Sequence, residues 1–290
     1  MPLDDLSSYL KLCFEEDKIF EDITTDCLFS SDIYIKANIL AKETGVCSGI
    51  WISGTIFKKV NQKVKIRYLK KDGQIIKAGD VLMQIQGPAV DILRCERLVL
   101  NLFSHLCGVA TLTRKYVDKI RETKAKIFDT RKTIPGLRLL EKYAVRCGGG
   151  YNHRLDLSDG VLIKDNHLFI LSKIKANQTL ASLVREVKRK TKGKELQIEV
   201  DNVEQFIDAL EGYPDIILLD NMSIAEIRKC VAIRKNKKTK VQLEVSGNVN
   251  LSNVKEIALT GVDRISIGSL THSSQSLDLS LEISDVIPKS

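Results

Sequence analysis

The chain has 290 residues, 43% of them hydrophobic, and a formal net charge of +8. A chain of this size can bury one large core or two ordinary ones, so it needs no disulfide staples. Its seven cysteines, an odd number without a Cys-x-x-Cys pair, favour a reducing compartment. No apolar run reaches the roughly 18 residues of a spanning helix, and the acidic start MPLDDLSSYL lacks signal-peptide features. We therefore predict a cytoplasmic protein with no membrane association.

The first part of the chain combines strands with one long helix. Strand character covers residues 33–57 and 64–87, and Asp72-Gly73 is a favourable hairpin turn within the second stretch. Residues 88–120 follow a helical pattern that opens with Pro88, a residue well suited to a first helical position.

From residue 125 onward, short β-branched runs alternate with helical patterns. The runs are 126–132, 160–166, 196–202, 215–221, 241–248 and 264–269, and the helical patterns are 137–149, 181–193, 203–212, 223–235 and 251–261. Nearly continuous apolar strands that alternate with helices indicate a parallel sheet covered by helices. We expect an α/β barrel, whole or incomplete, with an open doubly wound sheet as the alternative. Residues 278–283 alternate like one more strand, which could return to the N-terminal sheet.

Polar and charged residues recur where the predicted parallel strands end. They are Arg131, Lys132, Lys164, Glu199, Asp220, Glu244, Ser246 and Gly268. In either architecture the carboxyl ends of parallel strands form the ligand-binding face. The pattern therefore predicts a ligand site at this edge of the sheet.

The charge pattern indicates an anionic ligand. Arg131, Arg138 and Arg154 offer bidentate donors for carboxylates or phosphates, and they are accompanied by Lys132 and Lys164. His153 would add a donor that depends on its protonation.

Two acids and two small-residue segments complete the predicted site. Glu199 and Asp220 suit Mg²⁺ held together with substrate phosphates. Ser246-Gly247-Asn248 and Gly268-Ser269 supply main-chain N–H groups near helix starts, where a phosphomonoester binds. The residues thus suggest a substrate pair that carries carboxylates, a pyrophosphate and a phosphate.

The segment TRKTIPGLRLLEKYAVRCGGGYNHRLDLSDGVLIKDNH, residues 130–167, resembles the signature region of the quinolinate phosphoribosyltransferases. Agreement continues in EDITT, in GPAVDILRCERLVLNLFSHLCGVAT, and in IEVD, LLDNM, LEVSGN and ISIGSLTHS, and so spans nearly the whole chain in order. Asp156 departs from this pattern, because a glycine is usual there, and its charge is expected to weaken anion binding modestly.

The resemblance implies an enzyme that joins quinolinate to phosphoribosyl pyrophosphate in NAD synthesis, with Mg²⁺ and no organic cofactor. It also implies an incomplete α/β barrel with an N-terminal α/β sandwich domain, and a homodimer or a hexamer built from dimers. On this basis we place the sandwich domain at 1–112, joined by a C-terminal strand within 276–290, and the catalytic barrel at 113–275.

The resemblance further assigns roles to individual positions. Arg131, His153, Arg154 and Lys164 would bind the pyridine dicarboxylate, and Arg97 would reach in from the neighbouring subunit. The donor and its Mg²⁺ would be handled by Lys132, Glu199, Asp220, Ser246, Gly247 and Gly268, with Asn248 completing the phosphate loop.

Other roles are possible for some of these residues and for the whole protein. Arg97 shares helical spacing with an apolar stripe, so a buried salt bridge with Asp91 or Glu96 is the alternative role. The basic runs at 188–194 and 234–240 suit a solvated helix end or a nucleic-acid-binding module, but aromatic residues make up only 6% of the chain and do not interleave with them. A related transferase that uses a monocarboxylate such as nicotinate is the catalytic alternative.

Overall fold

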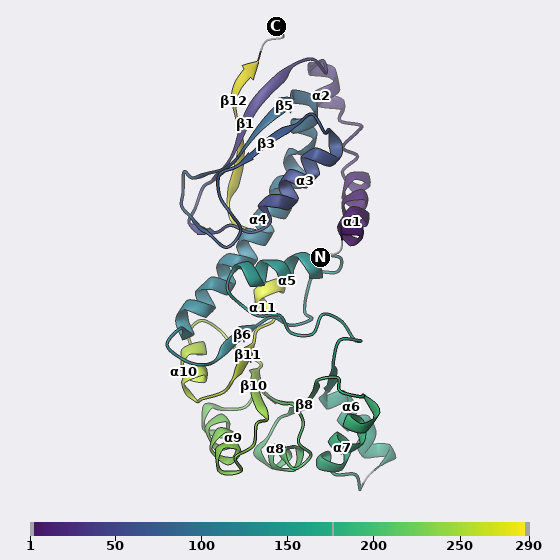
Figure 1. Ribbon diagram of the computed structural model, residues 1–290, viewed down its shortest axis with the longest axis vertical. Helices are drawn as coiled ribbons and strands as arrows, with labels where there is room; N and C mark the ends of the chain where they lie inside the picture. The colour runs from purple at the N-terminus through teal and green to yellow at the C-terminus, as the bar shows by residue number, and fades with distance from the viewer. Residues whose placement is uncertain (1–2, 176, 288–290) are drawn as a thin grey trace. The chain divides into compact units, whose positions relative to one another are not determined.

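The computed structural model describes residues 3–175 and 177–287, and it divides into two compact units (Figure 1). Unit 1 comprises the chain up to Arg114, Thr133–Gly149, and the chain from Leu270 onward. Unit 2 comprises Lys115–Lys132 and Gly150–Ser269. Among the described residues, no helix is both long enough and apolar enough to cross a membrane.

Unit 1 is built on a four-stranded antiparallel sheet. Its strand order is β12 (Leu279–Ile287), β1 (Tyr34–Ala41), β5 (Val81–Pro88) and β3 (Lys65–Tyr68). Burial alternates along β1, where Ile35, Ala37 and Ile39 lie inside, as expected for a sheet with one solvated face. Figure 1 shows α3 (Ile50–Val60) and α4 (Ala89–Ile120) beside this sheet.

The remaining elements of unit 1 are small. They are α1 (Leu3–Glu16), α2 (Ile23–Leu28), α5 (Arg138–Cys147), most of α11 (Ser269–His272), and the paired strands β2 (Gly45–Val46) and β4 (Ile75–Ile76). The predicted Asp72-Gly73 turn exists, with Gly73 at φ 84°, but the hairpin is wrong. The turn joins β3 to β4, and these strands belong to different sheets because β4 pairs with β2.

Unit 2 contains the six predicted parallel strands. Their spatial order is β6 (Lys126–Phe128), β11 (Arg264–Ser266), β10 (Gln242–Ser246), β9 (Ile216–Asp220), β8 (Leu196–Val200) and β7 (Val161–Ile163). Chain order and spatial order agree from β7 to β11, and β6 then pairs with β11. No ladder joins β6 to β7 in the described part of the chain. The barrel is therefore incomplete, and the predicted α/β class is confirmed.

Helices cover the sheet of unit 2 between successive strands. They are α6 (Asp165–Ile174), α7 (Leu180–Lys190), α8 (Val203–Leu210), α9 (Ile224–Asn236) and α10 (Val254–Leu259). Helix α9 begins with a capping box in which Ser223 and Glu226 each bind the other's main-chain N–H. The helix after β6 differs from the rest, since α5 belongs to unit 1 rather than to the barrel.

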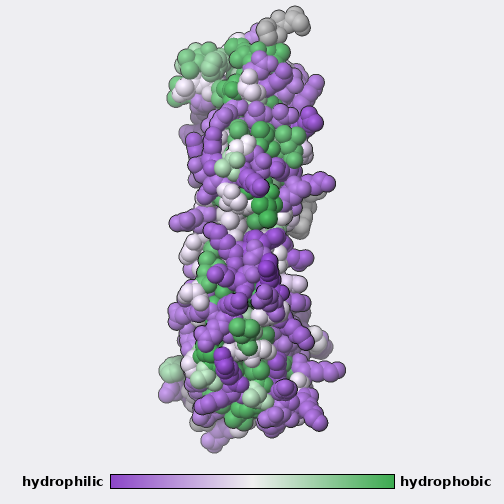
Figure 2. Space-filling view, turned by 90° about the vertical axis from the view of Figure 1, so that its left-hand side faces the viewer, coloured by the Kyte–Doolittle hydropathy of each residue, from purple (hydrophilic) through white to green (hydrophobic). Residues whose placement is uncertain are grey.

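The surface is mostly hydrophilic on the face drawn in Figure 2, where hydrophobic residues form small separate groups. Apolar residues fill the interior instead, and in the parallel strands Ile198, Ile217, Leu219 and Leu243 are completely buried. Burial of such side chains contributes about 1.5–3 kcal/mol each. This core fixes the strand ends in register and so positions the polar residues that follow them.

Candidate active site

A cavity of about 360 Å³ opens at the carboxyl ends of the strands of unit 2. It is lined by Thr130, Arg131, Lys132, His153, Arg154, Leu162, Lys164, Glu199, Leu218, Asp220, Glu244, Ser246 and Ser266. Eight of the residues predicted for the site therefore line one cavity, and they come from five of the six strand ends and the segment before β7. We call this space the cation-lined cavity.

The two guanidinium groups in this cavity lie close enough to repel each other. Burial, and then the charge of Arg131, lower the pKa of Arg154 below its ordinary value, although Asp159 opposes this effect. Arg154 Nη1 donates to the main-chain oxygen of Gly160 at 3.0 Å, which fixes the side chain. Partly buried like charges held together by the fold are stabilised when an anion binds between them.

The acidic side of the cavity is formed by Glu199 on β8 and Asp220 at the end of β9. Burial, and then the neighbouring Asp220, raise the pKa of Glu199 to about 7, while Lys164 and Lys132 oppose the shift. A bound cation would relieve the repulsion between the two carboxylates. The donor set therefore fits a hard divalent ion, with the other ligands supplied by water and substrate oxygens.

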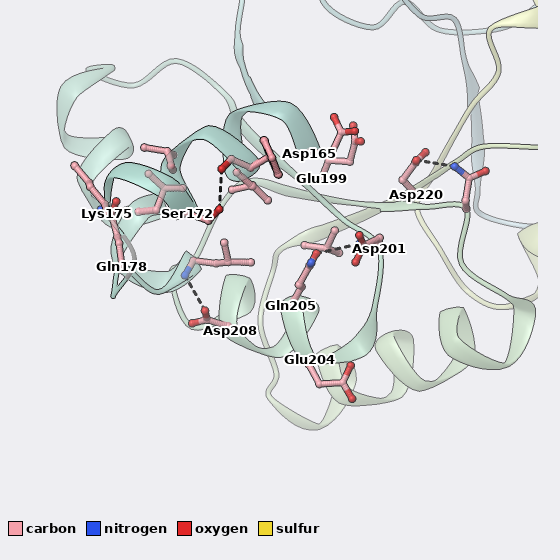
Figure 3. A pocket seen from close by; sticks show the side chains of 17 residues that line it. Asp165, Ser172, Lys175, Gln178, Glu199, Asp201, Glu204, Gln205, Asp208 and Asp220 are labelled. Atoms are coloured by element: carbon pink, nitrogen blue, oxygen red, sulfur yellow. Dashed lines mark hydrogen bonds between the residues drawn. The ribbon is translucent and has the colours of Figure 1, made fainter.

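A second and larger cavity, of about 870 Å³, lies beside the first and also contains Glu199 and Asp220 (Figure 3). Its other charged lining residues are mostly acidic, namely Asp165, Asp201, Glu204 and Asp208, with Lys175 as the single basic residue among its described lining. An acidic lining disfavours a polyanionic ligand. The cation-lined cavity is therefore the better candidate for a reacting anion, although it is the smaller of the two.

The loop after β10, which is predicted from the sequence to bind phosphate, turns through two consecutive residues with positive φ. Gly247 and Asn248 have φ values of 88° and 52°, and Asn248 Nδ2 donates to Asn221 Oδ1 at 3.0 Å. A Cβ on Gly247 would lie 2.2 Å from that same oxygen. Ser246 lines the cavity. The other predicted residues of this kind, Gly247, Asn248 and Gly268, are not among its lining residues.

We expect Gly247→Ala to lower the free energy of unfolding by about 2–4 kcal/mol, because strain at positive φ adds to the clash with Asn221. Gly193→Ala is the matched control, since Gly193 has a φ of 86° and a Cβ added there would meet nothing within 4 Å. That variant should lose only about 1–2 kcal/mol. Urea denaturation measures both changes. Equal losses would show that the fit against Asn221 is unimportant.

Two predicted arginines lie outside the cavity. Arg97 is exposed on α4 and forms no ion pair among the described residues, so a buried salt bridge with Asp91 or Glu96 is wrong. Asp91 instead accepts from Asn61 Nδ2 at 2.6 Å. Arg138 belongs to α5 in unit 1, where its Nε donates to Thr133 Oγ1 at 3.1 Å.

Asp156 uses its carboxylate within its own loop. Its Oδ1 accepts from the main-chain N–H of Ser158 at 2.7 Å and from that of Asp159 at 3.1 Å. The pKa of Asp156 is lowered first by a side-chain hydrogen bond from Ser158 Oγ and then by these main-chain bonds. The charge of Arg131 makes the smallest contribution to the lowering. The carboxylate thus shapes the turn after Arg154 in addition to lying within electrostatic range of Arg131.

In and around the cavity lie residues to which no individual role was assigned from the sequence, although Glu244 was among the polar residues predicted at the strand ends. Glu244 and Ser266 line it, and Gln197 Oε1 lies 2.9 Å from His153 Nε2. Asp129 Oδ1 accepts from the main-chain N–H of His153 at 2.8 Å. Gln197 and Ser266 lie within strands, where the hydrophobic pattern gives no sign that a polar residue belongs to a site.

The fold is that of an incomplete α/β barrel, and the cavity at its strand ends brings five cationic or histidine side chains together with three acids, as in an enzyme that acts on anions. Models of the two domains of quinolinate phosphoribosyltransferase match this sequence, the N-terminal domain over residues 22–107 and the C-terminal domain over 109–282. The chain belongs to the quinolinate phosphoribosyltransferase family, as the sequence resemblance predicted.

Individual relatives support this membership. The chain is 39% identical over 264 residues to a nicotinate-nucleotide pyrophosphorylase (carboxylating) of Mycobacterium leprae, covering 90% of this chain and 91% of the relative. It is similar to the solved nicotinate-nucleotide pyrophosphorylase of Ehrlichia chaffeensis, with 40% identity, a TM-score of 0.87, and coverage of 98% and 99% of the two chains. The structure from Francisella tularensis has 36% identity and a TM-score of 0.89, with 98% of each chain covered.

Proposed function

We infer that the protein transfers the phosphoribosyl group of phosphoribosyl pyrophosphate to quinolinate with loss of CO₂, giving nicotinate mononucleotide and pyrophosphate in NAD biosynthesis. The observation that carries this inference is the cation-lined cavity, where Arg131, Arg154 and Lys164 lie in one space with Glu199 and Asp220. A pyridine dicarboxylate requires several donors, and a pyrophosphate donor requires a cation held by acids.

In the proposed mechanism, Arg131, Arg154 and Lys164 hold the two carboxylates of quinolinate and thereby aim its ring nitrogen at C1′ of the donor. Such positioning can supply several of the roughly 7–11 kcal/mol available from preorganisation. The ring nitrogen forms a bond to C1′ while the bond from C1′ to the pyrophosphate oxygen breaks. The transition state carries positive charge on the ribose, which the carboxylates of Glu199 and Asp220 tolerate.

We propose that Lys132 neutralises the departing pyrophosphate from its position after β6. Mg²⁺, held by Glu199 and Asp220, would supply further positive charge to the pyrophosphate when bound. The main chain at Ser246, Gly247, Asn248 and Gly268 is proposed to bind the 5′-phosphate. After transfer, the pyridinium ring accepts the electron pair of the breaking carbon–carboxylate bond, CO₂ leaves, and a proton then replaces it. This chemistry requires no organic cofactor.

We further propose a homodimer in which Arg97 enters the site of the neighbouring subunit. The exposure of Arg97 and its lack of an ion pair among the described residues support this role. The division into a sandwich domain at 1–112 with a returning C-terminal strand, and a barrel at 113–275, is retained as a proposal. The antiparallel pairing of β12 with β1 supports the returning strand, of which residues 288–290 lie outside the described part.

The nucleic-acid-binding alternative is not favoured. Several cations of the two basic runs are neutralised locally, as when Lys188 Nζ lies 3.1 Å from Asp215 Oδ1 and Lys237 pairs with Glu211. A monocarboxylate substrate would leave part of the cation-lined cavity without a partner, which is costly for partly buried arginines.

An assay of the purified protein tests the proposed function. With quinolinate, phosphoribosyl pyrophosphate and Mg²⁺, we expect equal amounts of CO₂ and nicotinate mononucleotide. With nicotinate in place of quinolinate, we expect turnover at least about 10³-fold slower, because unpaired buried donors discriminate strongly between substrates. Comparable turnover of the two acids would overturn the assignment to a dicarboxylate.

The raised pKa of Glu199 predicts a pH dependence of Mg²⁺ binding. Below about pH 7, a proton on Glu199 competes with the metal, so the apparent dissociation constant should rise by about tenfold per pH unit. Above that pH it should level off. Calorimetric titration of the protein with Mg²⁺ alone measures the constant, and Glu199→Gln should flatten the pH dependence near pH 7.

The raised pKa of Glu199 also makes the stability of the metal-free protein depend on pH. Stability should fall as the pH rises, whereas Mg²⁺ binding should become tighter. Because the folded-state pKa lies above the ordinary 4.5, the folded protein binds the proton more tightly than the unfolded chain. Its contribution to the free energy of unfolding is therefore present below about pH 4.5 and is lost as the pH rises towards 7. Added Mg²⁺ should reverse the loss.

A further inference from the structure

A completely buried carboxylate of the parallel sheet lies in the wall of the cation-lined cavity. Glu244 is on β10, and its side chain has no solvent exposure. Its Oε1 accepts a hydrogen bond from Ser266 Oγ on β11 and lies 3.4 Å from His153 Nε2. Its Oε2 lies 2.7 Å from Arg264 Nε, but the N–H is not aligned, so the contact is an ion pair rather than a good hydrogen bond.

A gain in folding stability does not by itself explain why this carboxylate is buried. A buried ion pair costs several kcal/mol of desolvation per ion, and a well-packed apolar pair in its place is often neutral or more stable. Burial alone would raise the pKa of Glu244, but His153, Arg264 and Ser266 together lower it, so the group is held as an anion. Arg264 is itself held in place by Phe128, whose ring centre is 4.0 Å from the guanidinium carbon.

The hydrogen bonds around His153 select one tautomer of the imidazole. The main-chain N–H of Arg154 points at Nδ1 at 2.8 Å, and because an N–H can only donate, Nδ1 must accept. The ring proton is then on Nε2, which faces Gln197 Oε1 at 2.9 Å and Glu244 Oε1 at 3.4 Å. Both ring nitrogens therefore have partners within the protein.

We propose that Glu244 is a positioning residue for dicarboxylate binding, which acts through His153 on Arg154. With Gln197, it holds the His153 ring in the Nε2–H tautomer, and the ring then anchors the main chain of Arg154 so that its guanidinium points into the cavity. Second partners of this kind fix ring orientation at many catalytic histidines. The proposal rests on the proposed function and gives His153 a structural link to the substrate through Arg154.

The ring nitrogens of His153 report the first part of this proposal without any substrate. The chain has four histidines, and loss of signal in His153→Gln assigns the resonances. In the unaltered protein, ¹⁵N spectra should show a neutral ring protonated at Nε2. In Glu244→Gln, the N–H of Nε2 loses its charged neighbour, so its proton resonance should move upfield and the proton should exchange faster with water. An unchanged resonance and exchange rate would overturn the proposal.

Steady-state kinetics test the second part of the proposal, which is the effect of Glu244 on dicarboxylate binding through Arg154. Glu244→Gln should raise KM for quinolinate about tenfold and leave KM for phosphoribosyl pyrophosphate within about twofold, since only the dicarboxylate contacts depend on Arg154. A merely structural residue would instead change the thermal midpoint and both KM values together. Equal effects on the two substrates would contradict a positioning role.

A double variant separates positioning from folding. Glu244→Leu with Arg264→Met removes both buried charges and should fold with nearly unchanged stability. We expect it to keep the tenfold defect in KM for quinolinate, and a normal KM would overturn the proposal. Because the ring spectrum needs no turnover, a protein that shows the expected change at Nε2 but never uses quinolinate would contradict the proposed function and not the role of Glu244.

Discussion

Replacement of Arg131 by alanine should lower kcat/KM for quinolinate by about 10³-fold while leaving the folded state as stable as before. Truncating one member of a desolvated charge pair costs about 2–5 kcal/mol of binding, and each 1.4 kcal/mol is a factor of ten. Stability should not fall, because Arg131 and Arg154 repel each other in the ligand-free cavity, as the lowered pKa of Arg154 indicates. Steady-state kinetics and thermal denaturation of the same preparation measure both effects.

The matched control for this variant is Arg189→Ala. Arg189 is exposed near the end of α7 in one of the basic runs, so its removal changes the net charge by the same amount. It should leave kcat/KM within about twofold, since exposed charges distant from the site contribute little. If Arg131→Ala behaved like Arg189→Ala, the dicarboxylate would have to bind elsewhere.

Asp220→Asn should reduce kcat by about 10²–10³-fold and weaken the apparent affinity for Mg²⁺. The amide keeps the shape of the side chain but removes one of the two charges that would hold the ion against the pyrophosphate. It also removes the charge that, after burial, most raises the pKa of Glu199, so the pH below which Mg²⁺ binding weakens should fall. Turnover and calorimetric titrations at several Mg²⁺ concentrations measure these changes.

Asp201→Asn provides the control, because Asp201 lines the acidic cavity of Figure 3 but not the cation-lined cavity. Loss of one acid there should have less than a threefold effect on kcat. Equal defects in the two variants would mean that general acidity, and not the pairing of Asp220 with Glu199, governs the reaction.

Much of the barrel and of its ligand face is predictable from the sequence. The strands β6 to β11 are short apolar runs with polar residues at one end, and parallel strands bring those ends to one edge. That reasoning is sufficient to predict Arg131, Lys164, Glu199 and Asp220 near one another, because each lies within three residues of the end of a strand. The reaction itself is predicted only from the family resemblance, because a hydrophobic pattern carries no information about the substrates.

Other features could not be predicted, and the physical reasons differ. Gln197 occupies a position where strand burial predicts an apolar residue, and the place of Glu244 near a strand end does not predict its complete burial. Only the tertiary structure reveals the partners that make the burial of these side chains tolerable. The helical pattern of α5 gives no sign that this helix leaves the barrel for unit 1, because amphipathicity identifies a buried face but not the surface that buries it. The exposure of Arg97 is equally hard to predict, because the apolar spacing around it suggests a buried position.

The structure of this protein in complex with quinolinate tests the central claim most directly, namely that one cavity gathers the dicarboxylate against its cations. We predict that the two carboxylates lie within hydrogen-bonding distance of Arg131, Arg154 and Lys164, with the ring nitrogen directed towards Glu199 and Asp220. Quinolinate bound away from these side chains, in a protein that still turns it over, would contradict the account.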